Sequence, residues 1–253
     1  MDYPFSIEQY RQITAGSFYY YAYRKLDSIV AEKLFTLEAL KFQWIKTSEF
    51  YQDKTPATHK LIWWQQELSR LKAATPSMPL SERLFHHYHN DNQPLWFSLI
   101  ESLEEDLNYA LETLMLGRHD LHEHCRQNYI GIAKIQAAVV ANIDKEHIYQ
   151  FNRCNEIIRH LFCIRRHSHR DICLDKQLRP DIHKNTFKNI ANHWYQEAQN
   201  AAGIFKQAEP DAKSLHKLNK MHLKLAKKWI AKVNNPFKQG VTFSSLNYLF
   251  ASL

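Results

Sequence analysis

Histidine is the residue type in this sequence with the broadest capacity for chemistry, because it titrates near neutral pH and binds metals. The 15 histidines include three local groups. These groups are His86, His87 and His89; His119, His122 and His124 beside Cys125; and His167 and His169. A zinc site usually needs four nitrogen or sulfur ligands, often in close pairs, and the chain has neither H-E-x-x-H nor C-x-x-C. We therefore expect solvated or helix-capping histidines and no bound metal.

Other catalytic signatures are missing from the sequence. It has no G-x-S-x-G elbow, no kinase set and no dinucleotide fingerprint. Glycine occurs only 5 times, whereas strand hairpins and phosphate-binding loops depend on glycine turns. This composition argues against β-sandwiches, Rossmann folds and P-loop enzymes.

Helical periodicity runs through most of the chain. In residues 95–115, apolar side chains recur at three- and four-residue steps, which is typical of one buried helical face. Further helices are expected over residues 7–30, 34–51, 61–71, 122–142, 147–162, 186–207, 212–233 and 244–253. Residues 165–183 have the weakest periodicity and are the best candidate for a loop or lid. The pattern predicts one all-α domain over residues 1–253, a bundle of roughly eight to ten helices.

Charge is unevenly distributed along the chain. The formal net charge is +7, and no acidic residue follows Asp211. The segment Lys213–Lys232 carries seven lysines: Lys213, Lys217, Lys220, Lys224, Lys227, Lys228 and Lys232. A solvated outer helix is the first interpretation and peripheral contact with an anionic membrane is the second. Nucleic acid comes third, because no recognition motif accompanies the charge.

The four cysteines, Cys125, Cys154, Cys163 and Cys173, have no paired spacing and predict reduced thiols in a cytoplasmic protein. We expect neither a signal peptide nor a membrane span, because no stretch of about 20 apolar residues occurs. Aromatic runs at residues 18–23 and 63–64 predict helical core packing or the lining of a pocket for a long apolar ligand. The candidate lining residues are Tyr19, Tyr20 and Trp64, with Asp106 from the acidic run at residues 101–106.

Four stretches of this sequence, in order, resemble the squalene/phytoene synthase family. They are I-T-A-G-S-F-Y-Y-Y-A-Y-R-K-L at 13–26, H-K-L-I-W-W-Q-Q-E-L-S-R-L at 59–71, L-I-E-S-L-E-E-D-L-N-Y at 99–109 followed by H-C-R-Q-N-Y-I-G at 124–131, and N-E-I-I-R-H at 155–160. The closing segment follows the family pattern too, so the likeness is collinear over nearly the whole chain. The resemblance implies an all-α isoprenoid-synthase fold with a central cavity, in which two aspartate-rich motifs on facing helices hold Mg²⁺ and prenyl diphosphates.

Both aspartate-rich motifs are degenerate in this sequence. Counting back from the double tryptophan places the first motif at Thr47 and Tyr51, with Glu49 as the only carboxylate nearby. A competing register would keep Asp27 and replace its partner by Ala31, but it leaves too long a gap before the double tryptophan.

The second motif follows Asn155 and Arg159, where His160 and Ile164 stand in place of the aspartates. A neutral side chain cannot replace a carboxylate around magnesium, and histidine prefers softer metals.

The missing carboxylates predict a protein that has kept the scaffold and lost the chemistry. It would bind an isoprenoid or lipid, or act on a protein partner as an assembly factor, as the phytoene-synthase-like assembly factor of respiratory complex I does; no cofactor is expected. The alternative is an active head-to-head prenyltransferase whose Mg²⁺ ligands come from Asp27, Glu32, Glu49, Asp53, Asp171 and Asp175. A third interpretation is a helical interaction module with a filled core.

Overall fold

The computed structural model describes residues 7, 12–51, 53–89, 93–117, 120–169, 172 and 175–253. Within this part of the chain every regular element is a helix, which confirms the predicted all-α class. The elements are α1 Phe18–Tyr23, α2 Ser28–Phe50, α3 Lys54–Lys72, α4 Pro79–Tyr88, α5 Gln93–Leu116, α6 Leu121–Gln127, α7 Ile130–Val140, α8 Lys145–His167, α9 Lys184–Ala208, α10 Lys213–Lys232 and α11 Ser245–Ser252. None of these helices combines the length and apolarity that crossing a bilayer requires.

Two predicted helices are each divided in two by local backbone chemistry. The helix expected over residues 7–30 is interrupted before Asp27, whose carboxylate accepts hydrogen bonds from Ile29 N and Val30 N and so begins α2. The helix expected over residues 122–142 breaks at Tyr129, which has a left-handed backbone (φ 56°). A further helix, α4, was not predicted and begins with Pro79 in its first turn.

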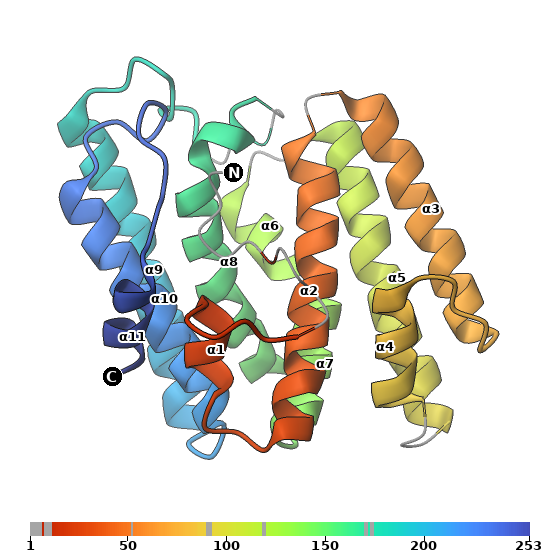
Figure 1. Cartoon of the computed structure of the whole chain (residues 1–253). Coiled ribbons are helices and arrows are strands. Elements are labelled where there is room, and N and C mark those ends of the chain that lie inside the picture. Colours follow the sequence, from red (N-terminus) through yellow and green to blue (C-terminus); the bar gives the residue numbers. More distant parts are fainter. Residues whose placement is uncertain are drawn as a thin grey trace.

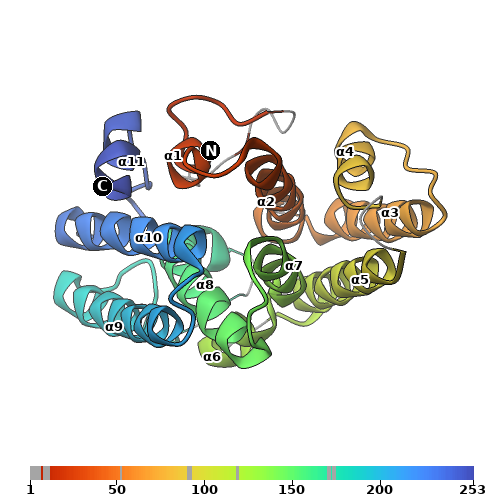
Figure 2. The ribbon, with the colours of Figure 1, turned by 90° about the horizontal axis from the view of Figure 1, so that it is seen from below.

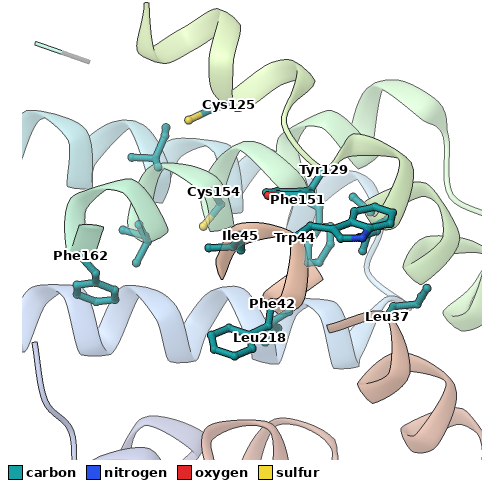
Figure 3. Close-up of a cluster of buried hydrophobic side chains, with 14 of the residues drawn as sticks. Leu37, Phe42, Trp44, Ile45, Cys125, Tyr129, Phe151, Cys154, Phe162 and Leu218 are labelled. Atoms are coloured by element: carbon teal, nitrogen blue, oxygen red, sulfur yellow. The ribbon is translucent and has the colours of Figure 1, made fainter. Parts of the chain in front are cut away.

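Helix α8 lies at the centre of the bundle. Figure 1 places it between α9 and α10 on one side and α2 and α7 on the other, and it packs against all four. The view from below (Figure 2) shows α3, α4 and α5 flanking α2 and α7, and α11 lying beside α10 near α1. Apolar side chains fill much of the centre (Figure 3): Leu37, Phe42, Trp44, Ile45, Tyr129, Phe151, Cys154 and Leu218.

The segment predicted as a loop or lid overlaps the end of α8. That helix continues to His167, so the first residues of the predicted loop are helical. The connection to α9 then runs to His183, whose imidazole Nδ1 accepts from Asn185 N and caps α9, as expected for a capping histidine. Residues 170–171 and 173–174 lie outside the described residues, and the lid stays a prediction.

Helices α5 and α7 approach each other closely at Gly131. A Cβ atom on Gly131 would lie 2.0 Å from the carbonyl oxygen of Ser102, so no side chain fits there. The buried Asp106 carboxylate accepts from Gly131 N at 2.8 Å and Ile132 N at 2.7 Å, which satisfies two backbone donors in the first turn of α7. These contacts fix how α7 is set against α5.

The close approach predicts that Gly131→Ala destabilises the protein by about 3 kcal/mol, because the obstructing atoms belong to backbone that cannot rotate away. Gly203→Ala is the matched control, since a Cβ at Gly203 on α9 meets nothing within 4 Å. It should stabilise the protein by about 0.5–1 kcal/mol through helix propensity alone. Urea denaturation of both variants measures the difference, and equal effects would contradict the proposed packing constraint.

Candidate functional site

Glu49, from the segment predicted as the first motif, and Arg159, beside the predicted second motif, meet across the interface of α2 and α8. Arg159 Nη1 donates to Glu49 Oε2 at 2.5 Å, joining residues 110 positions apart in the sequence. On its other side, Arg159 donates from Nη2 and Nε to Glu156 Oε2 at 2.8 and 3.0 Å. The guanidinium is therefore held between two carboxylates, one from each helix.

Lys41 completes the charge balance of this group. Its Nζ lies 2.6 Å from Glu156 Oε1, so two cations face two carboxylates. We call Lys41, Glu49, Glu156 and Arg159 the α2–α8 ion cluster. Glu49, Glu156 and Arg159 expose 3% or less of their side chains, and buried charges persist only when paired in this way. The ring of Tyr129 lies near both cations, 5.2 Å from Lys41 Nζ and 5.7 Å from Arg159 Cζ.

Two buried histidines extend the ion cluster along α8. A guanidinium can only donate, so His160 Nε2 accepts from Arg159 Nη2 at 2.9 Å and the proton of the neutral ring lies on Nδ1. That Nδ1 then donates to His167 Nδ1 at 3.0 Å, and His167 Nε2 donates to Glu49 Oε2 at 2.8 Å. The hydrogen bonds close a ring from Arg159 through both imidazoles to Glu49.

The environment fixes the charge of each member. Burial alone would raise the pKa of Glu49, but Arg159 and His167 outweigh it and hold that pKa well below its ordinary value. Burial and the nearby Arg159 hold the pKa of His160 well below its ordinary value. Burial also lowers the pKa of His167 and brings that of His124 to about 3. At neutral pH the carboxylates are ionised and the histidines are neutral.

Three side chains here have the types and proximity of metal ligands. Possible ligand atoms of Glu49, Cys163 and His167 all lie within 4.8 Å of one another. Both nitrogens of His167 are hydrogen-bonded, and the Glu49 oxygen that His167 contacts also accepts from Arg159. Burial raises the pKa of the Cys163 thiol to about 12 despite the nearby Arg159, so it is protonated and not nucleophilic at neutral pH. These groups therefore already form a hydrogen-bonded network. The Arg159 guanidinium, bound to Glu49, would also repel a metal cation placed at this position.

Little open space remains at this centre. The pocket beside His160, Ile164 and His167 has a volume of about 20 Å³, enough for about one water molecule. The side chains at three other predicted motif positions each have a hydrogen-bond partner of their own outside the ion cluster. Thr47 Oγ1 donates to Gln43 O within α2, Tyr51 Oη accepts from Lys60 Nζ at 3.4 Å, and Asn155 Oδ1 lies 2.6 Å from His222 Nδ1.

The carboxylates required by the active-enzyme alternative are engaged in separate places. Asp27 and Asp53 cap α2 and α3 and therefore lie beyond opposite ends of the 23-residue helix α2, which at 1.5 Å per residue is about 35 Å long. Glu32 pairs with Arg83. Asp175 Oδ1 accepts from Gln177 N at 2.8 Å, and Asp171 lies outside the described residues.

The four side chains expected to line a pocket come from three helices: Tyr19 and Tyr20 from α1, Trp64 from α3 and Asp106 from α5. Tyr19 donates to the buried Glu38 carboxylate at 3.0 Å, and Trp64 packs edge-on against Trp44 with ring centroids 6.1 Å apart. Tyr20 is half-buried beside Tyr21, and Asp106 caps α7.

The expectation of solvated or capping histidines is wrong for four of them. His124, His160, His167 and His222 are buried, because each finds a polar partner inside the bundle. Sequence reasoning singled out Arg159 and Glu49 but missed Lys41 and Glu156. The one local signal for Glu156 is its position three residues before Arg159 on a helix. His119 lies outside the described residues.

A groove lies between α4, α5, α7 and the first turns of α2, where Ile29, Val30 and Lys33 line it. It has a volume of about 400 Å³ and is lined by apolar side chains, among them Val30, Leu99, Ile135 and Val139. Among the residues that the structure describes, the charged ones lining the groove are Lys33 and Lys134. Lys33 Nζ lies 5.4 Å from the ring of Tyr88, and Lys134 Nζ lies 3.3 Å from Glu105 Oε2. The groove has the size and composition of a small-molecule site.

Comparisons with models of protein families, with curated proteins and with solved structures found no match to this chain.

The lowered pKa values of His124, His160 and His167 predict that the free energy of unfolding falls as the pH drops below about 6.5. In the unfolded chain these histidines bind protons near pH 6.5, whereas in the folded protein they resist protonation, so acid favours unfolding. Below pH 4.5 the carboxylates Glu49 and Glu156 add to the loss, because their pKa values are lowered in the fold. Urea denaturation at pH 7, 6 and 5 measures the slope.

His124→Phe should flatten that slope by up to about 1.4 kcal/mol per pH unit, since one group that titrates only in the unfolded chain is removed. The control is His59→Gln at an exposed position of α3, which should change the slope less than His124→Phe does. The same slope in the wild type and the His124→Phe variant would show that His124 is not held neutral by its surroundings.

Proposed function

We propose that this chain is an isoprenoid-synthase-like helical protein that binds an isoprenoid or similar lipid without transferring prenyl groups. The position of Arg159 between Glu49 and Glu156 carries the proposal. Metal-assisted loss of diphosphate needs carboxylate oxygens that are available to Mg²⁺. Here the two carboxylates nearest the motif positions already accept from Arg159, with Lys41 and His167 as further partners.

The same guanidinium is poorly placed to bind a diphosphate. Arginine recognises phosphate through its fork of N–H groups, but in Arg159 Nη1, Nη2 and Nε all donate to protein partners. A diphosphate would have to displace a buried carboxylate, and that would leave an uncompensated charge inside the bundle.

The groove between α2, α4, α5 and α7 supports lipid binding instead. Its apolar walls suit a prenyl or acyl chain, and Lys33 and Lys134 suit an anionic head group. We place the ligand in this lateral groove and not in a central cavity between α2 and α8.

One incubation tests binding and chemistry together. The protein is mixed with radiolabelled farnesyl diphosphate and Mg²⁺, and bound ligand and released diphosphate are both measured; geranylgeranyl diphosphate is tested in parallel. We expect saturable retention of intact ligand and no diphosphate release above a blank without protein. Clear turnover would contradict the proposal and favour the prenyltransferase alternative.

A variant with a filled groove tests whether the ligand binds there. Ala138 is exposed and lines the groove, so Ala138→Trp should fill it without disturbing the core and lower ligand retention at least tenfold. Ala208→Trp places the same side chain on an exposed position at the end of α9 and should bind as the wild type does. Equal binding by all three proteins would exclude the groove as the site.

A further inference from the structure

Helix α11 presents an apolar row to solvent. Leu246 and Phe250 lie four residues apart on one face of this helix, and Leu253 directly follows its last residue. They are 63%, 65% and 69% exposed, whereas Tyr248 and Ala251 on the other face are buried. Side chains of this size are costly to expose in a row, which indicates that something apolar covers them.

A row of lysines on α10 runs beside this helix. Lys220, Lys224 and Lys228 are spaced by four residues and therefore lie on one face of α10. Lys220 Nζ donates to the carbonyl oxygen of Leu253 at 2.8 Å, and Lys228 Nζ donates to Asn247 Oδ1. These contacts place the lysine row of α10 along α11, and Figure 2 shows the two helices side by side.

Further cations from α1 and its C-terminal turn join the same region. Lys217 Nζ donates to the carbonyl oxygen of Tyr21, which brings α10 against α1 near Arg24 and Lys25. Burial, together with the positive charges of Arg24, Lys25 and Lys220, lowers the pKa of Lys217, so these cations lie near one another. Because no acidic residue follows Asp211, the segment that builds α10 and α11 supplies no carboxylate side chain to balance them.

We propose that this face, formed by the apolar row of α11 and the lysine row of α10, docks onto an anionic lipid membrane. Helices that bind at the bilayer interface combine exposed apolar side chains with flanking lysines. The anionic head groups attract the lysines, and the apolar side chains enter the boundary of the acyl chains. A nucleic acid would account for the lysines but not for the apolar row. The docking face is separate from the lateral groove, so the inference does not depend on the proposed lipid ligand.

Vesicle sedimentation tests the docking face. The full chain is mixed with vesicles of phosphatidylcholine alone or with about 30% phosphatidylserine, at about 0.1 M and about 0.5 M salt. We expect sedimentation with the anionic vesicles at low salt, and at least fivefold less with neutral vesicles or at high salt. Equal binding to both vesicle types, or no binding to either, would overturn the proposal, and the second result would favour a protein partner for this face.

Three variants locate the contact. Phe250→Ser should weaken vesicle binding at least tenfold, and Phe250→Trp should retain it, because tryptophan suits the interface as well as phenylalanine does. Lys224→Glu should also weaken it at least tenfold. Lys72→Glu makes the same change of net charge at an exposed position on α3, across the molecule in Figure 1, and should bind as the wild type does.

The four variants alter three residues, all of them exposed, and an unchanged circular-dichroism melting curve checks the fold. Wild-type binding by Phe250→Ser, or equal losses for Lys224→Glu and Lys72→Glu, would overturn the proposal, since the contact would then be neither apolar nor local.

Discussion

The desolvated guanidinium of Arg159 is the interaction on which the centre of this protein depends. It ties α8 to α2 through Glu49 and is held on its own helix by Glu156, and these three side chains are almost completely shielded from water. Removing one partner of such a group leaves a buried charge without compensation, at a cost of about 3–5 kcal/mol. The neighbouring polar groups are arranged around this requirement: Lys41 neutralises the second carboxylate, and the histidines satisfy the remaining donors and acceptors.

This constraint also directs where function can lie. A reactive centre needs groups that change protonation, ligands or partners during a cycle, whereas Arg159 and Glu49 are held in a closed ring of hydrogen bonds with His160 and His167. Ligand-accessible features lie elsewhere, in the groove beside α2 and on the face formed by α10 and α11. The proposed lipid binding and membrane docking therefore use the periphery of the bundle and leave its centre as scaffold.

Local sequence patterns predicted the helical class and most helix positions, because an apolar residue every three or four positions is a local property. The sequence pattern did not predict the helix breaks at Asp27 and Tyr129. The first depends on a capping carboxylate inside an aromatic and basic run, and the second on a left-handed backbone at a residue type that rarely adopts it. Glycine scarcity indicated helices, but it could not indicate that Gly131 is required by the α5–α7 contact.

The site was less predictable than the fold. Lys41 and Glu49 belong to α2, which is distant in sequence from Arg159 on α8. No local sequence pattern predicts which charged side chains of one helix will be buried against another helix. The same limit explains the histidines: composition favours solvated rings, whereas His160 and His167 are buried because Glu49 and Arg159 supply their partners. Of the residues in and beside the two predicted motifs, Glu49 and Arg159 meet across α2 and α8, while the assignment of those motifs stays a prediction.

A double-mutant cycle between Glu49 and Arg159 tests the central claim most directly. Urea denaturation would compare Glu49→Gln, Arg159→Met and the double variant, with the partly exposed pair Arg153 and Glu197, 3.6 Å apart, as the control cycle. Each single change should cost about 3–5 kcal/mol, and the double change at least 2 kcal/mol less than the two summed, against about 0–1 kcal/mol of coupling in the control. Additive effects at Glu49 and Arg159, within about 0.5 kcal/mol, would contradict a fold that depends on this buried pair.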